Sequence, residues 1–152
     1  MHLLREATRA VAPLGRQAMV LLAAAVSDFY VPKARIAQHK IQTAAHATLD
    51  LSLDPVPKVL GLLCQEWCTK AYVVSFKLET DPAILESKAL GALARYGHQG
   101  VIANLLSTRH KEVILFPGGE TIRCSDDSDD LEPALVAALL RRWTEDVACA
   151  ES

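Results

Sequence analysis

The uninterrupted apolar run from Ala18 to Val26 (AMVLLAAAV) constrains the fold more than any other stretch of this chain. A strand with one face in water alternates apolar and polar residues, whereas a strand covered on both faces reads as a continuous apolar run. The run therefore predicts a strand in the middle layer of an α/β fold. It ends abruptly on Ser27 and Asp28, which a buried strand does not require.

Two later apolar runs have the same character, and a helix signal separates them. The first covers residues 71–76 (AYVVSF) and the second residues 100–103 (GVIA). Between them, residues 80–82 (TDP) are typical of a helix start, with the aspartate as N-cap and the proline in the first turn. The pattern predicts a helix that continues to about Tyr96.

The segment before the second run has mixed signals. Residues 54–55 (DP) predict another capped helix start, whose apolar stripe continues to Trp67. Residues 47–53 (ATLDLSL) alternate cleanly, which predicts a strand with one wet face. Residues 31–46 have no clear period and read as a long loop, a kind of segment that is usually functional or disordered.

The C-terminal third predicts a hairpin and a helix. Residues 112–116 (EVILF) and 120–124 (ETIRC) flank a Pro-Gly-Gly turn, which favours two antiparallel strands. An acidic stretch, SDDSDDLEP, then leads into a last helix from about Leu131 to Val147. The order of helices and apolar strands predicts a parallel α/β sheet finished by an antiparallel hairpin.

The first residues, MHLLREATRAVAPLG, predict an amphipathic helix that stops near Pro13 and Gly15. Most α/β domains of this kind begin with a strand. The order therefore predicts that residues 1–152 form one partial domain, the later part of a longer fold. A transit-peptide role for the same segment stays open.

Composition excludes several classes of protein. The chain has 152 residues, of which 51% are apolar and 22% charged, as in an ordinary globular domain. A net charge of −2 and the lack of a basic block give no reason to expect nucleic acid or a membrane surface as partner. The 4 cysteines are scattered, which favours reduced thiols in the cytoplasm over disulfides. Cys64 and Cys68 share a helix face, but core packing is the simpler interpretation, and no metal site is predicted.

Polar groups follow the three buried strands where each strand ends. In open α/β sheets, ligands bind outside the carboxyl ends of the strands. The first run ends at Ser27-Asp28, the second leads into Lys77 and Glu79, and the third ends at Asn104. If these strands are parallel neighbours, their polar ends converge on one crevice.

Each of these residues also has a simpler interpretation. Asp28 is as consistent with capping the next segment as with holding a substrate amide or hydroxyl. Lys40, in AQHKIQ, could reach a phosphate or be a solvated lysine; Asn104 could read a nucleobase edge or satisfy backbone groups. Lys77 and Glu79 could form an ion pair without a function. The chain has no GxGxxG, no GxxxxGK[ST] and no GxSxG, so its sequence contains no recognisable phosphate loop or nucleophile elbow.

The motifs AAAVSDFYVP, HKIQ, VPKVL, VSFKLETDPAIL and VIAN followed by TR occur in this order between Ala18 and Arg109. Together they resemble phosphopantothenoylcysteine synthetase of the eukaryotic type, also called phosphopantothenate–cysteine ligase, over its C-terminal half only. The resemblance implies a Rossmann-like three-layer sandwich with a mostly parallel central sheet and a C-terminal antiparallel hairpin, truncated at its N-terminus.

The resemblance implies a cytoplasmic enzyme of coenzyme A biosynthesis. Such a ligase activates the carboxylate of 4'-phosphopantothenate as an acyl-nucleotidylate, with release of pyrophosphate, and L-cysteine then displaces the nucleotide monophosphate. The implied nucleotide is ATP, with CTP as an alternative, and Mg²⁺ accompanies it. The implied assembly is a homodimer, with no nucleic-acid or membrane partner.

Site residues follow by motif from the same resemblance. Ala24, Ala25 and Asp28 would contact the phosphopantothenate moiety, and Lys40 would stabilise the activated intermediate, so Asp28 and Lys40 are the expected catalytic residues. Phe76 and Asn104 would contact the adenine ring.

The chain also departs from the family pattern. The glycine-rich first half has no counterpart here, and residues 43–47 (TAAHA) replace a short Gly/Ser patch. The alternative is a non-catalytic half-domain or paralogue that acts as a binding or dimerisation module.

Overall fold

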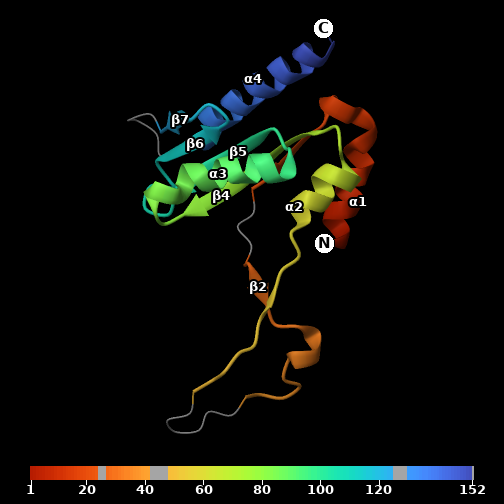
Figure 1. The fold of residues 1–152 in the computed structure, drawn as a ribbon, viewed down its shortest axis with the longest axis vertical. Helices are drawn as coiled ribbons and strands as arrows, with labels where there is room; N and C mark the ends of the chain where they lie inside the picture. The colour runs from red at the N-terminus through yellow and green to blue at the C-terminus, as the bar shows by residue number, and fades with distance from the viewer. Residues whose placement is uncertain (24–26, 42–47, 125–129, 152) are drawn as a thin grey trace. The chain divides into compact units, whose positions relative to one another are not determined.

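The computed structural model describes residues 1–23, 27–41, 48–124 and 130–151 (Figure 1). The chain divides into two compact units, one made of Met1–Ala24 and Val59–Ser152 and the other of Ala25–Lys58. We call them the sheet unit and the inserted unit, and each is described by itself.

The sheet unit contains a mixed five-stranded sheet in the order β1-β4-β5-β6-β7. Three strands are parallel: β1 (Met19–Leu22), β4 (Tyr72–Glu79) and β5 (Gly100–Leu105). The hairpin of β6 (Glu112–Phe116) and β7 (Glu120–Arg123) adds antiparallel strands at one edge. The predicted parallel sheet with a C-terminal hairpin is therefore confirmed.

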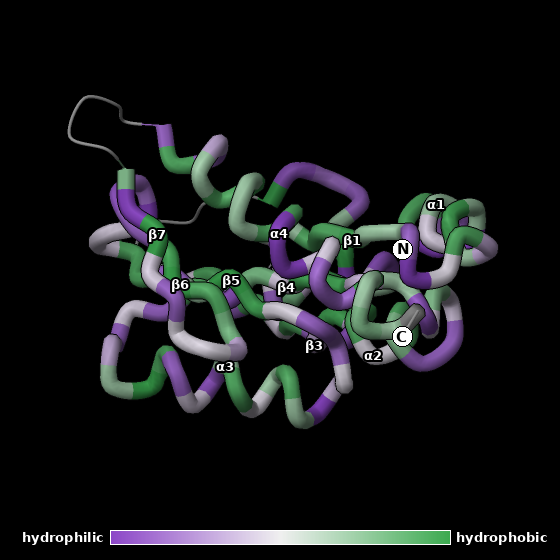
Figure 2. The backbone as a smooth tube through the Cα atoms, turned by 90° about the horizontal axis from the view of Figure 1, so that it is seen from above, coloured by the Kyte–Doolittle hydropathy of each residue, from purple (hydrophilic) through white to green (hydrophobic). Residues whose placement is uncertain are grey.

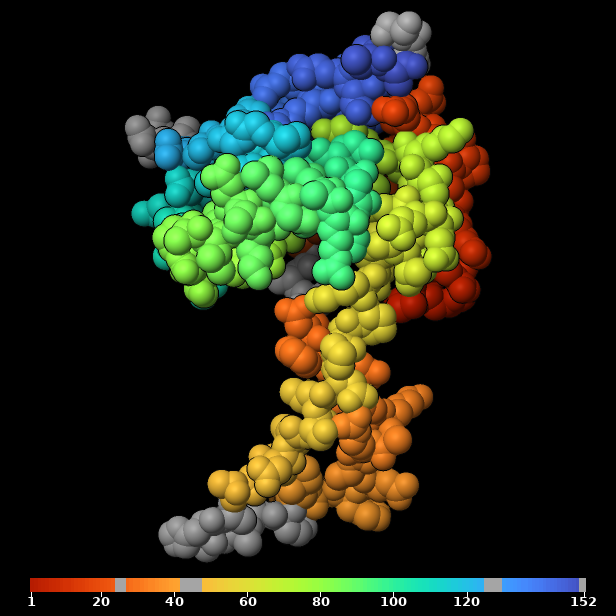
Figure 3. Space-filling model, viewed as in Figure 1, coloured from red at the N-terminus to blue at the C-terminus, as the bar shows by residue number. Residues whose placement is uncertain are grey.

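Helices cover both faces of this sheet (Figure 2). The helix α4 (Glu132–Glu151) packs on one face, over a core that includes Val74, Ile102 and Leu115. The other face is covered by the remaining helices, and Figure 3 shows α3 in green beside α2 in yellow-green. These helices are α1 (His2–Val11), α2 (Val59–Leu62), which continues as the π turn η3 (Leu63–Trp67), and α3 (Pro82–Tyr96). The three-layer, Rossmann-like architecture is confirmed.

Local sequence explains why α3 lies where the sequence predicts it. The Asp81 carboxylate accepts a hydrogen bond of 2.9 Å from the amide of Ala83, and Pro82 occupies the first turn. The helix ends at Gly97, whose φ of 66° is left-handed and suits a residue without a Cβ.

No helix among the described residues is long and apolar enough to span a membrane.

The inserted unit is built around a short ladder between β2 (Phe29–Tyr30) and β3 (Asp54–Pro55). Arg35, in the 3₁₀ turn η2 (Lys33–Arg35), donates hydrogen bonds to the Ser52 hydroxyl, at 2.5 Å, and to the Asp54 carboxylate. The unit is therefore closed by pairing between its two chain ends.

Two sequence predictions are wrong in this unit. Asp54-Pro55 does not start a helix, because Asp54 pairs in an extended conformation with Tyr30 and its carboxylate is taken by Arg35; the helix begins at Val59. The alternating segment is not a strand over residues 48–53, and its leucines are exposed, because no described strand pairs with it there. The structure does not describe Ala47.

Candidate functional site

A pocket of about 330 Å³ lies at the carboxyl end of the parallel strands in the sheet unit. Both residues expected to contact a nucleobase, Phe76 and Asn104, line it. The lining side chains come from three regions. These regions are the end of β1, the strands β4, β5 and β6 with the loop between β5 and β6, and the first half of α4. The lining residues are Leu21, Ala23, Phe76, Asn104, Arg109, Val113, Leu131, Glu132, Leu135, Val136 and Leu139.

The register of the sheet explains why Phe76 and Asn104 meet. Phe76 of β4 pairs with Ile102 of β5, and both belong to the apolar core under α4. Side chains two residues apart on a strand point to the same face, so Asn104 lies on the same face as Ile102. The strands thus place an aromatic ring and a carboxamide on the α4 side of the carboxyl edge.

Three polar side chains line the pocket, and they have few partners in the protein. Within the described residues, the Arg109 side chain donates one hydrogen bond, from Nη1 to the carbonyl of Leu106 at 3.0 Å. The side chains of Asn104 and Glu132 make no hydrogen bond or ion pair with another described residue. The amide of Glu132 is capped by the carboxylate of Asp130 at 3.2 Å, which fixes the first turn of α4. These groups are available for a ligand.

The second pair of strand-end residues has a simpler role. Lys77 Nζ lies 3.0 Å from Glu79 Oε1, on the same strand. The two charges neutralise each other, which fits the interpretation of an ion pair without a function.

The expected catalytic residues Asp28 and Lys40 belong to the inserted unit. The Asp28 side chain is 74% exposed and forms an ion pair with Lys58 at 2.7 Å. Its carbonyl accepts a hydrogen bond from the amide of Val56, so Asp28 also joins the two ends of this unit. Lys40 is exposed and has no hydrogen bond or ion pair to another described residue. Ala24 and Ala25 lie outside the described residues.

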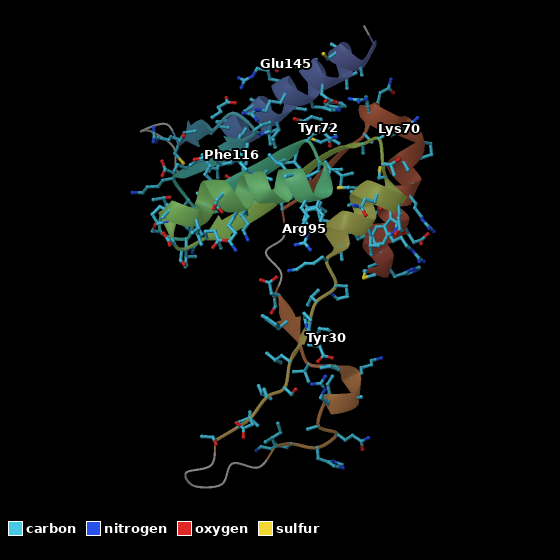
Figure 4. All side chains as sticks on the ribbon, viewed as in Figure 1. Tyr30, Lys70, Tyr72, Arg95, Phe116 and Glu145 are labelled. Carbon is cyan, nitrogen blue, oxygen red and sulfur yellow. The ribbon has the colours of Figure 1, made fainter. Side chains whose placement is uncertain are left out.

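A second cavity, of about 440 Å³, lies at the opposite, amino end of the strands and was not predicted from the sequence. Tyr72 begins β4 there and lies between the sheet and α4, which carries Glu145 (Figure 4). Glu120 accepts hydrogen bonds from Arg141 at 2.6 Å and from Arg142 at 2.9 Å. These hydrogen bonds lower the pKa of Glu120. The residues that form this cavity are far apart in sequence, and only the Arg141-Arg142 pair could have marked it.

A buried hydrogen-bonded pair lies under the other face of the sheet. Ser75 Oγ and His98 Nε2 are 2.8 Å apart, and both residues are buried. The Nδ1 atom of His98 has no hydrogen-bond partner among the described residues. Burial lowers the pKa of His98, because the charged imidazolium would lose its hydration there.

A magnesium ion would require several oxygen ligands. Among the described residues, no group of three or more His, Cys, Asp or Glu side chains is arranged to hold a metal ion. The described side chains therefore do not form a site that encloses Mg²⁺ with protein ligands alone. The cysteines at positions 64 and 68 are free thiols.

Comparison with known proteins identifies the family. Residues 4–117 match the family model of the DNA/pantothenate metabolism flavoprotein C-terminal domain. The phosphopantothenate–cysteine ligase of Homo sapiens is 49% identical over 115 residues, which cover 76% of this chain and 37% of that protein. Phosphopantothenate–cysteine ligase 2 of Oryza sativa subsp. japonica is 43% identical over 150 residues, which cover 97% of this chain and 46% of that protein.

A solved structure has the same fold. A Cab2 mutant in complex with phosphopantothenate-cysteine superposes with a TM-score of 0.82 and 41% identity, over 95% of this chain and 50% of that chain. The chain thus spans about half the length of these relatives or less. The match of the family model, the identities and the fold together show that the chain belongs to the DNA/pantothenate metabolism flavoprotein C-terminal domain family, on the side of the eukaryotic phosphopantothenate–cysteine ligases.

Proposed function

We propose that this chain takes part in the ATP-dependent ligation of 4'-phosphopantothenate with L-cysteine, a step of coenzyme A biosynthesis. The names of its relatives support this activity, and so does the Cab2 mutant, which was solved in complex with the product, phosphopantothenate-cysteine. The observation that carries the proposal is the pocket at the carboxyl strand ends, where Phe76 and Asn104 meet.

The reaction has two steps. The carboxylate of phosphopantothenate attacks the α-phosphorus of ATP, so that an acyl-adenylate forms and pyrophosphate leaves. The amine of cysteine then attacks the acyl carbon, and AMP leaves while an amide bond forms. Both steps depend mainly on holding the reactants together and on stabilising negative charge.

The nucleobase is assigned to the pocket of the sheet unit. The ring of Phe76 offers a flat apolar surface for the base, and base–aromatic stacking contributes about 1–3 kcal/mol. The carboxamide of Asn104 can donate and accept hydrogen bonds at a base edge. CTP is the alternative nucleotide. Mg²⁺ would be bound mainly by the nucleotide's phosphates, since the described side chains form no site for it.

The acyl substrate is assigned to Ala24, Ala25, Asp28 and Lys40. The Asp28 carboxylate orients the phosphopantothenate moiety through its amide or hydroxyl groups, together with Ala24 and Ala25. The Lys40 ammonium stabilises the negative charge of the acyl-adenylate. Lys40 is supported by its exposure and by its lack of a described partner. For Ala24 and Ala25, the support is the sequence motif.

The inserted unit also supports a homodimer. Its described residues include seven large apolar side chains that are exposed in the single chain, an arrangement that favours contact with another protein surface. They are Phe29, Tyr30, Ile36, Ile41, Leu49, Leu51 and Leu53. The same observation favours the second candidate function, a non-catalytic binding or dimerisation module.

The proposed location is the cytoplasm. Free thiols fit this compartment, where cysteines stay reduced.

The test is release of pyrophosphate by the purified 152-residue chain, measured with ATP and Mg²⁺ and with either phosphopantothenate or cysteine left out in turn. The ligase proposal predicts release that requires phosphopantothenate, and amide product that requires both. Lys40→Gln should lower the rate by about 10²–10³-fold, as for other groups that stabilise developing charge. Lys33→Gln, which removes a neighbouring charge of η2, is the matched control.

Two outcomes separate the candidate functions. If the chain forms no product while sedimentation shows a dimer, these 152 residues act as a binding module and do not carry the ligase activity by themselves. If product forms at equal rates in the Lys40→Gln variant, the ligase stands and the assignment of Lys40 is overturned.

A further inference from the structure

The carboxyl-end pocket is lined by 11 residues, of which Asn104, Arg109 and Glu132 are polar. A nucleobase in this pocket contacts apolar side chains over most of its surface. The hydrogen-bonding atoms at its edge have these three side chains, backbone groups and water as partners. The choice of base therefore depends on what the three side chains donate and accept.

The three side chains differ in what they offer. A carboxylate only accepts hydrogen bonds, a guanidinium only donates them, and a carboxamide does both. The free ring nitrogens of adenine and cytosine accept hydrogen bonds, so Arg109 and the amide nitrogen of Asn104 suit them. The carboxylate of Glu132 requires a donor, and the exocyclic amino group of adenine or cytosine is one.

We infer that Glu132 accepts a hydrogen bond from the exocyclic amino group of the base and thereby selects amino-bearing nucleotides over those with a carbonyl at the same position. A carbonyl oxygen there would face the carboxylate, and two acceptors repel each other. This inference rests on the proposed nucleotide pocket and adds to it the residue that chooses the base.

The local structure supports a fixed position for Glu132. Leu131 and Leu135, on either side of it in the sequence, are buried in the core under α4, and Asp130 caps the first turn. Glu132 is exposed and lines the pocket, and its carboxylate has no hydrogen bond or ion pair to another described residue. Residues 4–117 match the family model, so this part of α4 lies beyond the matched segment, and the match assigns it no role.

The experiment compares ATP with inosine triphosphate, which carries a carbonyl oxygen in place of the 6-amino group. Dissociation constants are measured by calorimetry on the 152-residue chain. The wild-type chain should bind ATP about tenfold or more tightly than inosine triphosphate, the effect of one hydrogen bond to a charged group. In Glu132→Gln the ratio should fall towards one, because an amide can either accept from the amino group or donate to the carbonyl.

The matched control is Glu145→Gln, which removes the same charge from the same helix at the other cavity. It should leave the ratio unchanged. A thermal melt of Glu132→Gln tests a merely structural role. If Glu132 only stabilised the helix start, the melting temperature would fall while the ratio stayed at its wild-type value.

The outcomes distinguish this inference from the ligase proposal. Equal affinity of the wild-type chain for the two nucleotides, no affinity for either, or an unchanged ratio in Glu132→Gln overturns the role of Glu132. If the wild-type chain prefers ATP, Glu132→Gln removes this preference, and the chain forms no amide product, the role of Glu132 is supported and the ligase activity of this chain is refuted. If the chain forms product but does not distinguish the two nucleotides, the ligase activity is supported and the role of Glu132 is refuted.

Discussion

The two ends of the central sheet each carry a cavity, but their polar side chains are used in opposite ways. At the amino end, Glu120 is paired with both Arg141 and Arg142, so these three charges satisfy one another. At the carboxyl end, the side chains of Asn104 and Glu132 make no hydrogen bond with another described residue. A larger cavity is therefore not the better candidate site, because a ligand needs groups that the protein has not already paired.

The largest expected effect on nucleotide binding is at the carboxyl end. Phe76→Leu keeps an apolar side chain in the core but removes the aromatic face. We expect the dissociation constant for ATP to rise about tenfold to a hundredfold, since base stacking is worth about 1–3 kcal/mol. The matched change at the other end, Tyr72→Leu, should leave this constant unchanged in a titration followed by calorimetry. Equal losses in both variants would contradict the contrast between the ends.

A smaller effect, on stability and not on binding, is expected at the amino end. Glu120→Ala removes the acceptor for two arginines, and we expect a loss of about 1–2 kcal/mol in the free energy of unfolding. Denaturant titration measures this loss of stability, and Glu132→Ala, at the carboxyl end, should change the free energy of unfolding by less than about 0.5 kcal/mol.

The pKa of Glu120 is lowered in the folded state, so the contribution of this residue to stability depends on pH. The contribution is present above the ordinary pKa of 4.5 and is lost as the pH falls below it. A Glu120→Ala variant as stable as the wild type would show that the paired end is not structural.

The smallest effect concerns His98, which is polar and buried but lines neither cavity. Its pKa is lowered in the folded state, so the unfolded chain binds more protons as the pH falls below about 6.5. Stability from the neutral histidine is present above this pH and decreases below it. His98→Gln should flatten the pH dependence of the melting temperature between about pH 6.5 and pH 5 while nucleotide affinity stays constant. A slope that persists in the variant would assign the acid sensitivity to another group.

Much of the sheet unit was predictable because its signals are local. Asp81, Pro82 and Gly97 define the ends of α3 through caps within a few residues. The second and third apolar runs mark the buried strands β4 and β5, whereas β1, in the first run, lies at the edge of the sheet and is partly exposed. Phe76 and Asn104 could be found because the carboxyl edge of a parallel sheet follows from strand order. The register between β4 and β5 places the side chains of Phe76 and Asn104 on the same face of the sheet.

The failures of the sequence predictions come from pairing between distant segments. The dipeptide Asp54-Pro55 fits a helix start as well as an extended pair. The choice is made by Arg35 and Tyr30, which lie 19 and 24 residues before Asp54 in the sequence. The sequence around Glu132 and the arginines of α4 contains no recognisable motif. The contacts of such a helix with the rest of the fold are needed to show which cavity its side chains line. The expected convergence of Asp28 with Phe76 and Asn104 stays a prediction, since Asp28 belongs to the inserted unit.

The position of α4 has a consequence for how this domain can be cut. The family match ends at residue 117, yet Leu131, Leu135 and Leu139 complete the apolar core over Val74 and Ile102. A fragment that stopped at the matched boundary would leave that face of the sheet open to water, and exposed apolar sheet surface promotes aggregation. For expression or crystallisation, the minimal folding unit is longer than the segment that the family model matches.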